Sequence, residues 1–229
     1  MKRVAIFLSI FTSFLIALNN DKPNFKNLNF RFIGPDGNRA IAISGVSSDH
    51  NTYYVGAASG GLFKTTNKGI SWEPIFDDQD VSSVSAIAIS QKNPNIVWAG
   101  TGETFLIRPA HAIGDGIYKS EDGGNTWKNM GLQKTARIAK IVIHPKNDKI
   151  VYVAALGHTF GPQEDRGIYK TTNGGKTWKK ILFIDQNTGG IDIALDRKNP
   201  NFLIASMWEI YINTWGLNSG GESGGVFIS

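Results

Sequence analysis

Cysteine is absent from the 229 residues of the sequence. This absence excludes disulfide bonds, thiolate metal sites and lipid attachment through an N-terminal cysteine. The sequence also lacks a P-loop, a zinc-ligand spacing and a dinucleotide-binding fingerprint. We therefore expect no cofactor and no metal, and we expect the folded state to be stabilised by packing alone.

A strong net charge is missing as well. The chain has 24 basic and 19 acidic residues, and two of the basic ones, Lys2 and Arg3, lie at the extreme N-terminus. The remainder carries a net charge of only +3, with no basic block interleaved with aromatic residues. This pattern argues against a nucleic-acid partner.

The N-terminus combines the two basic residues with an apolar run over residues 4–18, which only three hydroxyl-bearing residues interrupt. A basic start and a run of this length are typical of a secretory signal, and the run is shorter than the ~20 apolar residues of a membrane span. The sequence predicts a signal peptide over residues 1–19, export to the periplasm, cell surface or medium, and no membrane span in the mature chain. An uncleaved anchor is the alternative, because residues 17–19 do not form a small-x-small cleavage pattern.

The rest of the chain is built from a repeat of about fifty residues. One phrase reads GLFKTTNKGISW from Gly61, GIYKSEDGGNTW from Gly116 and GIYKTTNGGKTW from Gly167, and the chain stops in GVFIS. Between these phrases lie alternating apolar segments joined by short polar turns, such as IAISQKNPNIVWAG and IVIHPKNDKIVYVAA. A period of two indicates strands rather than helices.

Each repeat thus predicts four antiparallel strands, which we denote A to D, and this is the signature of a propeller blade. We expect an all-β fold in which residues 20–229 form a β-propeller segment. The predicted blades cover about residues 30–76, 82–130, 137–184 and 188–229. Because the fourth repeat stops before strand D, the sequence predicts an incomplete ring with further C-terminal blades.

The phrase S/T-x-D/N-x-G-x-T/S-W, here called the box turn, connects strands C and D. Its first and third residues can accept hydrogen bonds from turn amides, and its tryptophan stabilises a hairpin by roughly 2–3 kcal/mol when fully covered. A carboxylate or metal site at each turn is the alternative, but asparagine replaces the acid in two copies. The residues predicted to have this structural role are Thr65, Asn67, Gly69, Trp72, Ser120, Asp122, Gly124, Trp127, Thr171, Asn173, Gly175 and Trp178.

The box turn resembles the Asp-box, or bacterial neuraminidase repeat, of sialidases, xyloglucan-degrading hydrolases, sortilins and a photosystem assembly factor. All of these are β-propellers, and the resemblance covers nearly the whole mature chain. The longer text from GTGETF to GGKTW, residues 100–178, is most similar to large secreted bacterial proteins described as sortilin-like or glycosyl-hydrolase-like. The resemblance is specific for the fold and nearly silent on function.

Strand connectivity places the box turns on one face of the blades and the B–C loops on the other. The B–C loops vary in length, over residues 58–61, 102–115, 157–166 and 208–225. Binding groups concentrate on such loops, so we expect a protein, peptide or glycan ligand at this face. The candidate contact residues are Glu103, Arg108, His111, Asp115, His158, Glu164, Asp165, Arg166, Trp208, Glu209, Tyr211 and Trp215.

Each candidate also has a structural alternative. Asp115 and Asp165 can cap the turns that precede strand C, and Glu103 can bond the backbone of a neighbouring blade. A lone histidine in a loop is usually solvated. The sequence therefore leaves open which of these side chains contact a ligand.

A glycoside hydrolase is the alternative function. It needs two carboxylates, ~5–5.5 Å apart for retention or ~6.5–9.5 Å for inversion, and the acidic candidates above include enough carboxylates for such a pair. The resemblance to xyloglucanases implies an aspartate two residues before a Gly-Gly pair, where this sequence has Ala58. The resemblance to sialidases implies an early Arg-Ile-Pro phrase, which Arg31 and Arg39 do not match. No catalytic residue is carried over, and part of a site in further C-terminal blades stays an alternative.

Overall fold

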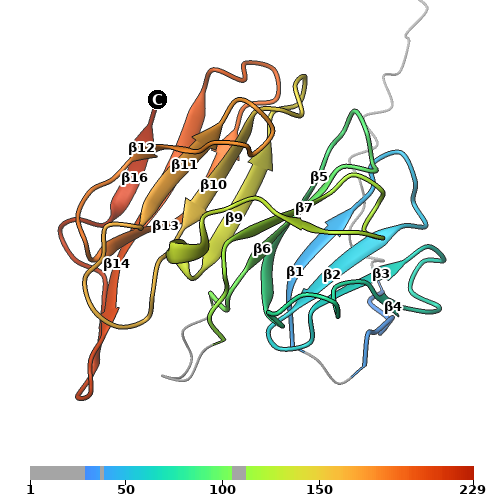
Figure 1. Ribbon diagram of the computed structural model, residues 1–229, viewed down its shortest axis with the longest axis horizontal. Coiled ribbons are helices and arrows are strands. Elements are labelled where there is room, and N and C mark those ends of the chain that lie inside the picture. The colour runs from blue at the N-terminus through green and yellow to red at the C-terminus, as the bar shows by residue number, and fades with distance from the viewer. Residues whose placement is uncertain (1–28, 37–38, 105–111) are drawn as a thin grey trace, which may run out of the picture. The chain divides into compact units, whose positions relative to one another are not determined.

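The computed structural model describes residues 29–36, 39–104 and 112–229, so the predicted signal peptide over residues 1–19 lies outside the described residues. The chain divides into two compact units, Met1–Phe32 and Ile33–Ser229. The second unit contains four four-stranded antiparallel sheets (Figure 1), which confirms the predicted fold class, an all-β propeller segment with four blades. Within the described residues, no helix is both long and apolar enough to traverse a lipid bilayer.

The first two blades have the same strand order. The first blade consists of β1 (Ala40–Gly45), β2 (Tyr53–Ala57), β3 (Leu62–Thr65) and β4 (Glu73–Pro74), and the second of β5 (Val84–Ile89), β6 (Val97–Thr101), β7 (Ile117–Ser120) and β8 (Lys128–Asn129). In both blades each strand pairs with the next one along the chain. These strands are therefore the predicted strands A to D in order.

The third blade repeats this order with β9 (Ile138–Ile143), β10 (Val151–Ala155), β11 (Gly167–Thr171) and β12 (Lys179–Leu182), after a short 3-10 helix η2 (Gln133–Thr135). The fourth blade differs. Its strands are β13 (Thr188–Leu195), β14 (Leu203–Ile212), β15 (Leu217–Ser219) and β16 (Gly225–Ile228). The long β14 pairs with β16 along its first half and with β15 near its end.

Apolar side chains fill the space between successive blades. Tyr54, Phe76 and Val97 belong to the core between the first and second blades. Further cores lie between the second and third blades and between the third and fourth, with buried Trp98 and Met207 among their respective members. Because a single sheet cannot cover both of its own faces, each blade is stabilised by its neighbour.

The three box turns share one hydrogen-bond pattern. In the second copy, the Ser120 hydroxyl accepts from the amide of Gly124 at 2.8 Å, and the Asp122 carboxylate accepts from the amide of Thr126 at 2.9 Å. In the third copy, Asn173 accepts from the amide of Thr177 at 3.0 Å through its side-chain oxygen. Asparagine therefore satisfies the turn as well as aspartate does, since the role requires an acceptor and not a charge.

Each box-turn tryptophan donates to a backbone carbonyl of an earlier segment of the chain. The indole Nε1–H of Trp127 donates to the carbonyl of Ile75, just after β4, at 2.7 Å, and that of Trp178 donates to Met130, just after β8, at 2.8 Å. The indole of Trp72 donates in the same way to Ile33 at 2.6 Å. We call these three hydrogen bonds the indole clamps. The acceptors of Trp127 and Trp178 each follow the outer strand of the preceding blade, while Ile33 precedes β1.

Gly175 shows how closely the third box turn packs on the second blade. Its φ is +90°, and a Cβ placed there would lie 2.6 Å from Cη2 of the buried Trp98. Gly161 also has a positive φ, +75°, but a Cβ there meets no atom within 4 Å. We expect Gly175→Ala to lower the free energy of unfolding by about 2–5 kcal/mol, because backbone strain and overpacking add. Gly161→Ala should cost only the strain, about 1–2 kcal/mol. Denaturant unfolding compares the two, and equal losses would contradict this packing.

Asp122 makes the stability of the second box turn depend on pH. The pKa of its carboxyl is lowered from 3.8 to about 2, first by the hydroxyl of Thr126 and then by the Thr126 amide and the Ser120 hydroxyl. A depressed pKa means that the ionised group stabilises the fold above pH 4 and that this contribution is lost as the pH falls towards 2. Asp122→Asn keeps the turn and removes the titration. Thermal melts between pH 6 and pH 2 should show a steeper fall for the natural protein than for the variant. Parallel curves of melting temperature against pH would show that ionisation of Asp122 does not contribute to stability.

Candidate functional site on the B–C loop face

The B–C loops connect β2 to β3, β6 to β7, β10 to β11 and β14 to β16, at the opposite ends of the strands from the box turns. Two candidate residues, Arg108 and His111, lie outside the described residues. The other ten are described, and their environments separate them into residues that hold loops in place and residues that lie at the surface.

Glu103 holds two blades together. It is only 1% exposed, and its carboxylate lies 2.6 Å from the guanidinium of Arg39, which precedes β1. Its backbone amide donates to the carbonyl of Ala112 at 2.8 Å. Because the carboxylate is buried and paired, Glu103 orients the second B–C loop and presents no free side chain to a ligand.

Asp115 fixes the start of β7. Its carboxylate accepts a hydrogen bond from the hydroxyl of Tyr118 at 2.6 Å, and its amide donates to the hydroxyl of Thr101 at 3.0 Å. Burial, with a smaller contribution from this hydrogen bond, raises the pKa of Tyr118 to about 12. The residue therefore acts as the turn cap that the sequence offered as its structural alternative.

Arg166 ties together three segments of the loop face. Its side chain is fully buried and donates to the carbonyls of Asn187 and Ile210, both at 2.8 Å, and of His158 at 3.1 Å. Burial lowers the pKa of its guanidinium to about 10, while Asp185 opposes the shift, so the group stays charged at neutral pH. Arg166 thus holds together the third B–C loop, the segment before β13 and the end of β14.

A second buried arginine, Arg137, was missed by the sequence reasoning. It is 1% exposed, and its Nε–H donates to the carbonyl of Gly157 at 2.5 Å. Burial, together with the positive charge of Arg166, lowers the pKa of Arg137 to about 10. The available signal was a lone basic residue at the start of an apolar strand, in ARIAKIVI.

The remaining candidates of the third loop take part in the fold through their backbone. The carbonyl of Asp165 accepts from the hydroxyl of Tyr169 at 3.0 Å, and that of Glu164 accepts from the ammonium of Lys180. The His158 carbonyl is the one held by Arg166. The Glu164 side chain is exposed, while His158 and Asp165 are half-buried.

The fourth B–C loop is shorter than predicted, because β14 continues to Ile212. Trp208, Glu209 and Tyr211 therefore lie on a strand and are half-buried rather than on a loop. The extension is stabilised by β15, which pairs with residues 210–212 in a hairpin. The Glu209 carboxylate accepts from the amide of Ser223 at 3.1 Å, so it organises the chain between β15 and β16.

The structure joins the third and fourth B–C loops into one surface. Phe160 pairs with Ile212 in a parallel bridge, and the amide of Ile212 donates to the carbonyl of Thr159 at 3.2 Å. Leu217 pairs with Ile212 from the other side. Phe160, Leu217 and Trp215 are 57%, 50% and 94% exposed, and we call these three residues the aromatic platform.

No pair of carboxylates is linked by a hydrogen bond on the described part of this face, and the described residues contain no group of three or more His, Asp or Glu side chains arranged to hold a metal ion. The side chains of Glu103, Asp115 and Glu209 are each engaged by a neighbouring group, as described above.

Two comparisons with known proteins find similar sequences. The family model described as Sortilin-Vps10, "Sortilin, neurotensin receptor 3", matches residues 115–219. A probable oligoxyloglucan-reducing end-specific xyloglucanase from Neosartorya fischeri is 25% identical over 153 residues, which are 64% of this chain and 16% of that protein. This chain therefore spans about a sixth of the length of that curated relative.

Solved structures show the same architecture. An ancestral GH74 enzyme superposes with a TM-score of 0.60 at 24% identity, over 78% of this chain and 23% of its own. A GH74 enzyme of Niastella koreensis gives 0.61 at 20% identity, over 82% and 28%. YCF48 bound to D1 peptide gives 0.52 at 16% identity, over 85% and 60%. Together with the four blades, these likenesses confirm the predicted resemblance: the chain is a β-propeller segment that is similar to sortilins and to glycosyl hydrolases.

Proposed function

We propose that the chain is the binding scaffold of an exported protein whose B–C loop face engages a protein, peptide or glycan ligand. The observation that carries this proposal is the aromatic platform, Phe160, Trp215 and Leu217, on two loops that the backbone ties together. Exposed apolar side chains that gather on one surface mark interaction sites. Aromatic residues are also enriched among those that dominate binding energy.

The platform is held in place before any ligand arrives. Arg166 fixes the backbone on both sides of it through Ile210 and His158, and Arg137 fixes the start of the third loop through Gly157. A surface whose backbone is already ordered loses less conformational entropy on binding. Buried guanidinium groups therefore support recognition without contacting the ligand themselves.

A glycoside hydrolase acting on polysaccharide is the second candidate, and the likeness to a xyloglucanase and to GH74 enzymes favours it. Two observations make it the weaker proposal. The position where the resemblance implies a catalytic aspartate is Ala58, which is completely buried. Glu103 and Asp115, the acids of the second loop, are engaged by Arg39 and Tyr118.

Export of the protein is part of the first proposal and rests on the signal peptide that the sequence predicts.

Replacing the platform tests the proposed function. We expect a glycan and peptide array to yield at least one ligand whose binding Trp215→Ala and Phe160→Ala each weaken by about tenfold or more, because each removes a central apolar contact. Ile70→Ala is the matched control, since Ile70 is 83% exposed on the first box turn, at the other end of the blades. The absence of any hit that both platform substitutions weaken would overturn the proposal, and release of sugars from xyloglucan would favour the second candidate.

Arg166 should control both stability and the order of the platform. We expect Arg166→Gln to lower the free energy of unfolding by about 2–4 kcal/mol, because buried carbonyls lose a charged donor. Hydrogen exchange should speed up at Ile212, whose amide bonds Thr159, more than at β10 in the centre of the third blade. Unchanged stability together with unchanged exchange at Ile212 would show that the guanidinium does not hold this surface.

A further inference from the structure

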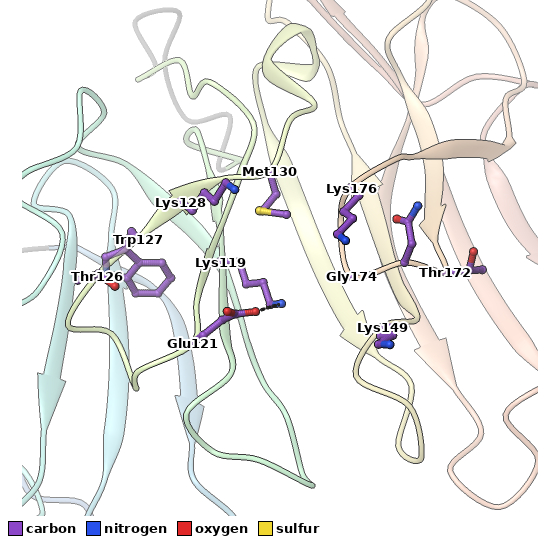
Figure 2. A pocket seen from close by; sticks show the side chains of 11 residues that line it. Lys119, Glu121, Thr126, Trp127, Lys128, Met130, Lys149, Thr172, Gly174 and Lys176 are labelled. Atoms are coloured by element: carbon purple, nitrogen blue, oxygen red, sulfur yellow. Dashed lines mark hydrogen bonds and ion pairs between the residues drawn. The ribbon is translucent and has the colours of Figure 1, made fainter.

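A groove lies between the second and third blades at the box-turn end of the strands, away from the aromatic platform. Its volume is about 750 Å³. Figure 2 shows its two walls, one carrying Trp127 and Lys128 of the second blade and the other carrying Lys149 and Lys176 of the third. A volume of this size accommodates a ligand of a few sugar units or a few amino-acid residues.

The groove has a strong excess of positive charge. Lys119 is paired at 2.5 Å with Glu121, which is the one acidic residue of the lining. Lys128, Lys149 and Lys176 are exposed and form no ion pair within 4 Å among the residues that the structure describes. Three ammonium groups on two facing walls raise the local concentration of anions, since a cleft of one sign focuses the field.

The rest of the lining includes an aromatic surface. The indole N–H of Trp127 is already bonded to the carbonyls of Ile75 and Gly124, so the exposed part of this side chain is aromatic ring. Two nearby carbonyls are engaged within the fold. The carbonyl of Met130 accepts from Trp178, and that of Lys149 accepts from Gly174.

Exposed ammonium groups beside an aromatic ring favour a ligand that is anionic and also has a flat apolar face. A polysaccharide that carries carboxylate or sulfate groups presents anionic oxygens to the ammonium groups. The C–H face of one of its sugar rings can also cover the exposed face of Trp127. An acidic peptide made of Asp and Glu supplies the charge without such a ring face.

The repeat shows that the charge is not required by the fold. The amide of Gly123 donates to the carbonyl of Asn95 as that of Gly174 does to Lys149, so Asn95 and Lys149 occupy equivalent positions. By the same register, the equivalents of Lys128 and Lys176 between the first and second blades are Glu73 and Asn125. The corresponding positions between the first and second blades therefore lack all three cations, although the box turn and the indole clamp there are the same.

We propose that the groove between the second and third blades binds a short segment of an anionic polysaccharide. Its carboxylate or sulfate groups contact Lys128, Lys149 and Lys176, and one sugar ring covers Trp127. This site is separate from the B–C loop face and does not depend on the function proposed for that face.

The repeat supplies the test. The triple variant Lys128→Glu, Lys149→Asn, Lys176→Asn gives the groove the residues of the corresponding positions between the first and second blades without touching a clamp. The probes are an oligogalacturonate, a sulfated oligosaccharide, a neutral xyloglucan oligosaccharide and poly-glutamate, titrated calorimetrically with the full chain. We expect at least one anionic oligosaccharide to bind, and we expect the triple variant to weaken it by about tenfold or more, with weaker binding at higher salt as screening requires. Binding of the carboxylated or of the sulfated probe identifies the anion.

The matched control makes the same three substitutions at exposed lysines elsewhere, as Lys92→Glu, Lys134→Asn and Lys198→Asn. It should retain affinity within about twofold, as should Trp215→Ala, and circular dichroism should show that all variants fold. Absence of binding to both anionic oligosaccharides, or an equal loss in the control triple, would overturn the proposal. Poly-glutamate binding as tightly as the oligosaccharide would overturn the assignment to a polysaccharide.

Discussion

The indole clamp is the interaction on which the packing of the blades depends. The indoles of Trp127 and Trp178 extend from their own hairpins and donate hydrogen bonds to carbonyls at the outer edge of the preceding blade. The indole of Trp72 donates to the carbonyl of Ile33, which precedes β1. A blade has two apolar faces and cannot shield them alone, so the clamp brings a large aromatic ring and a directed hydrogen bond to the same junction. Phe76 meets the Trp127 ring edge-on at 5.3 Å, which places the clamp at the margin of the core.

Because the clamps fix the box-turn end of the strands, the other end can vary in length without disturbing the packing. A different device organises that end. Buried Arg137 and Arg166 bond carbonyls on loops that have no regular partner strand, and Glu103 pairs with Arg39 across the first two blades. Charged side chains therefore hold the loops together where no ladder of backbone hydrogen bonds exists. The exposed side chains of the platform take no part in these contacts.

The repeat made the fold predictable, because period-two strands, a fixed interval and a tryptophan at one register all indicate a blade. The environment of single loop residues was not predictable. Glu103 pairs with Arg39, 64 positions earlier, and Arg166 donates to the carbonyl of Ile210, 44 positions later. No local sequence pattern predicts such long-range pairs. The segment WEIYI was assigned to a loop, although its apolar residues suit the strand that β15 completes. The groove between the second and third blades could not be predicted from the sequence, because its residues come from two repeats and come together only in the folded chain.

The most direct measurement of the central claim is hydrogen exchange at the indole nitrogens, resolved by NMR. The account predicts that the Nε1–H groups of Trp72, Trp127 and Trp178 exchange far more slowly than that of Trp215, which is 94% exposed. For Trp127 and Trp178 the protection should also match that of the backbone amides in the centres of the blades, since opening either clamp requires two blades to separate. Exchange of the clamp indoles at the rate of Trp215 would contradict the account.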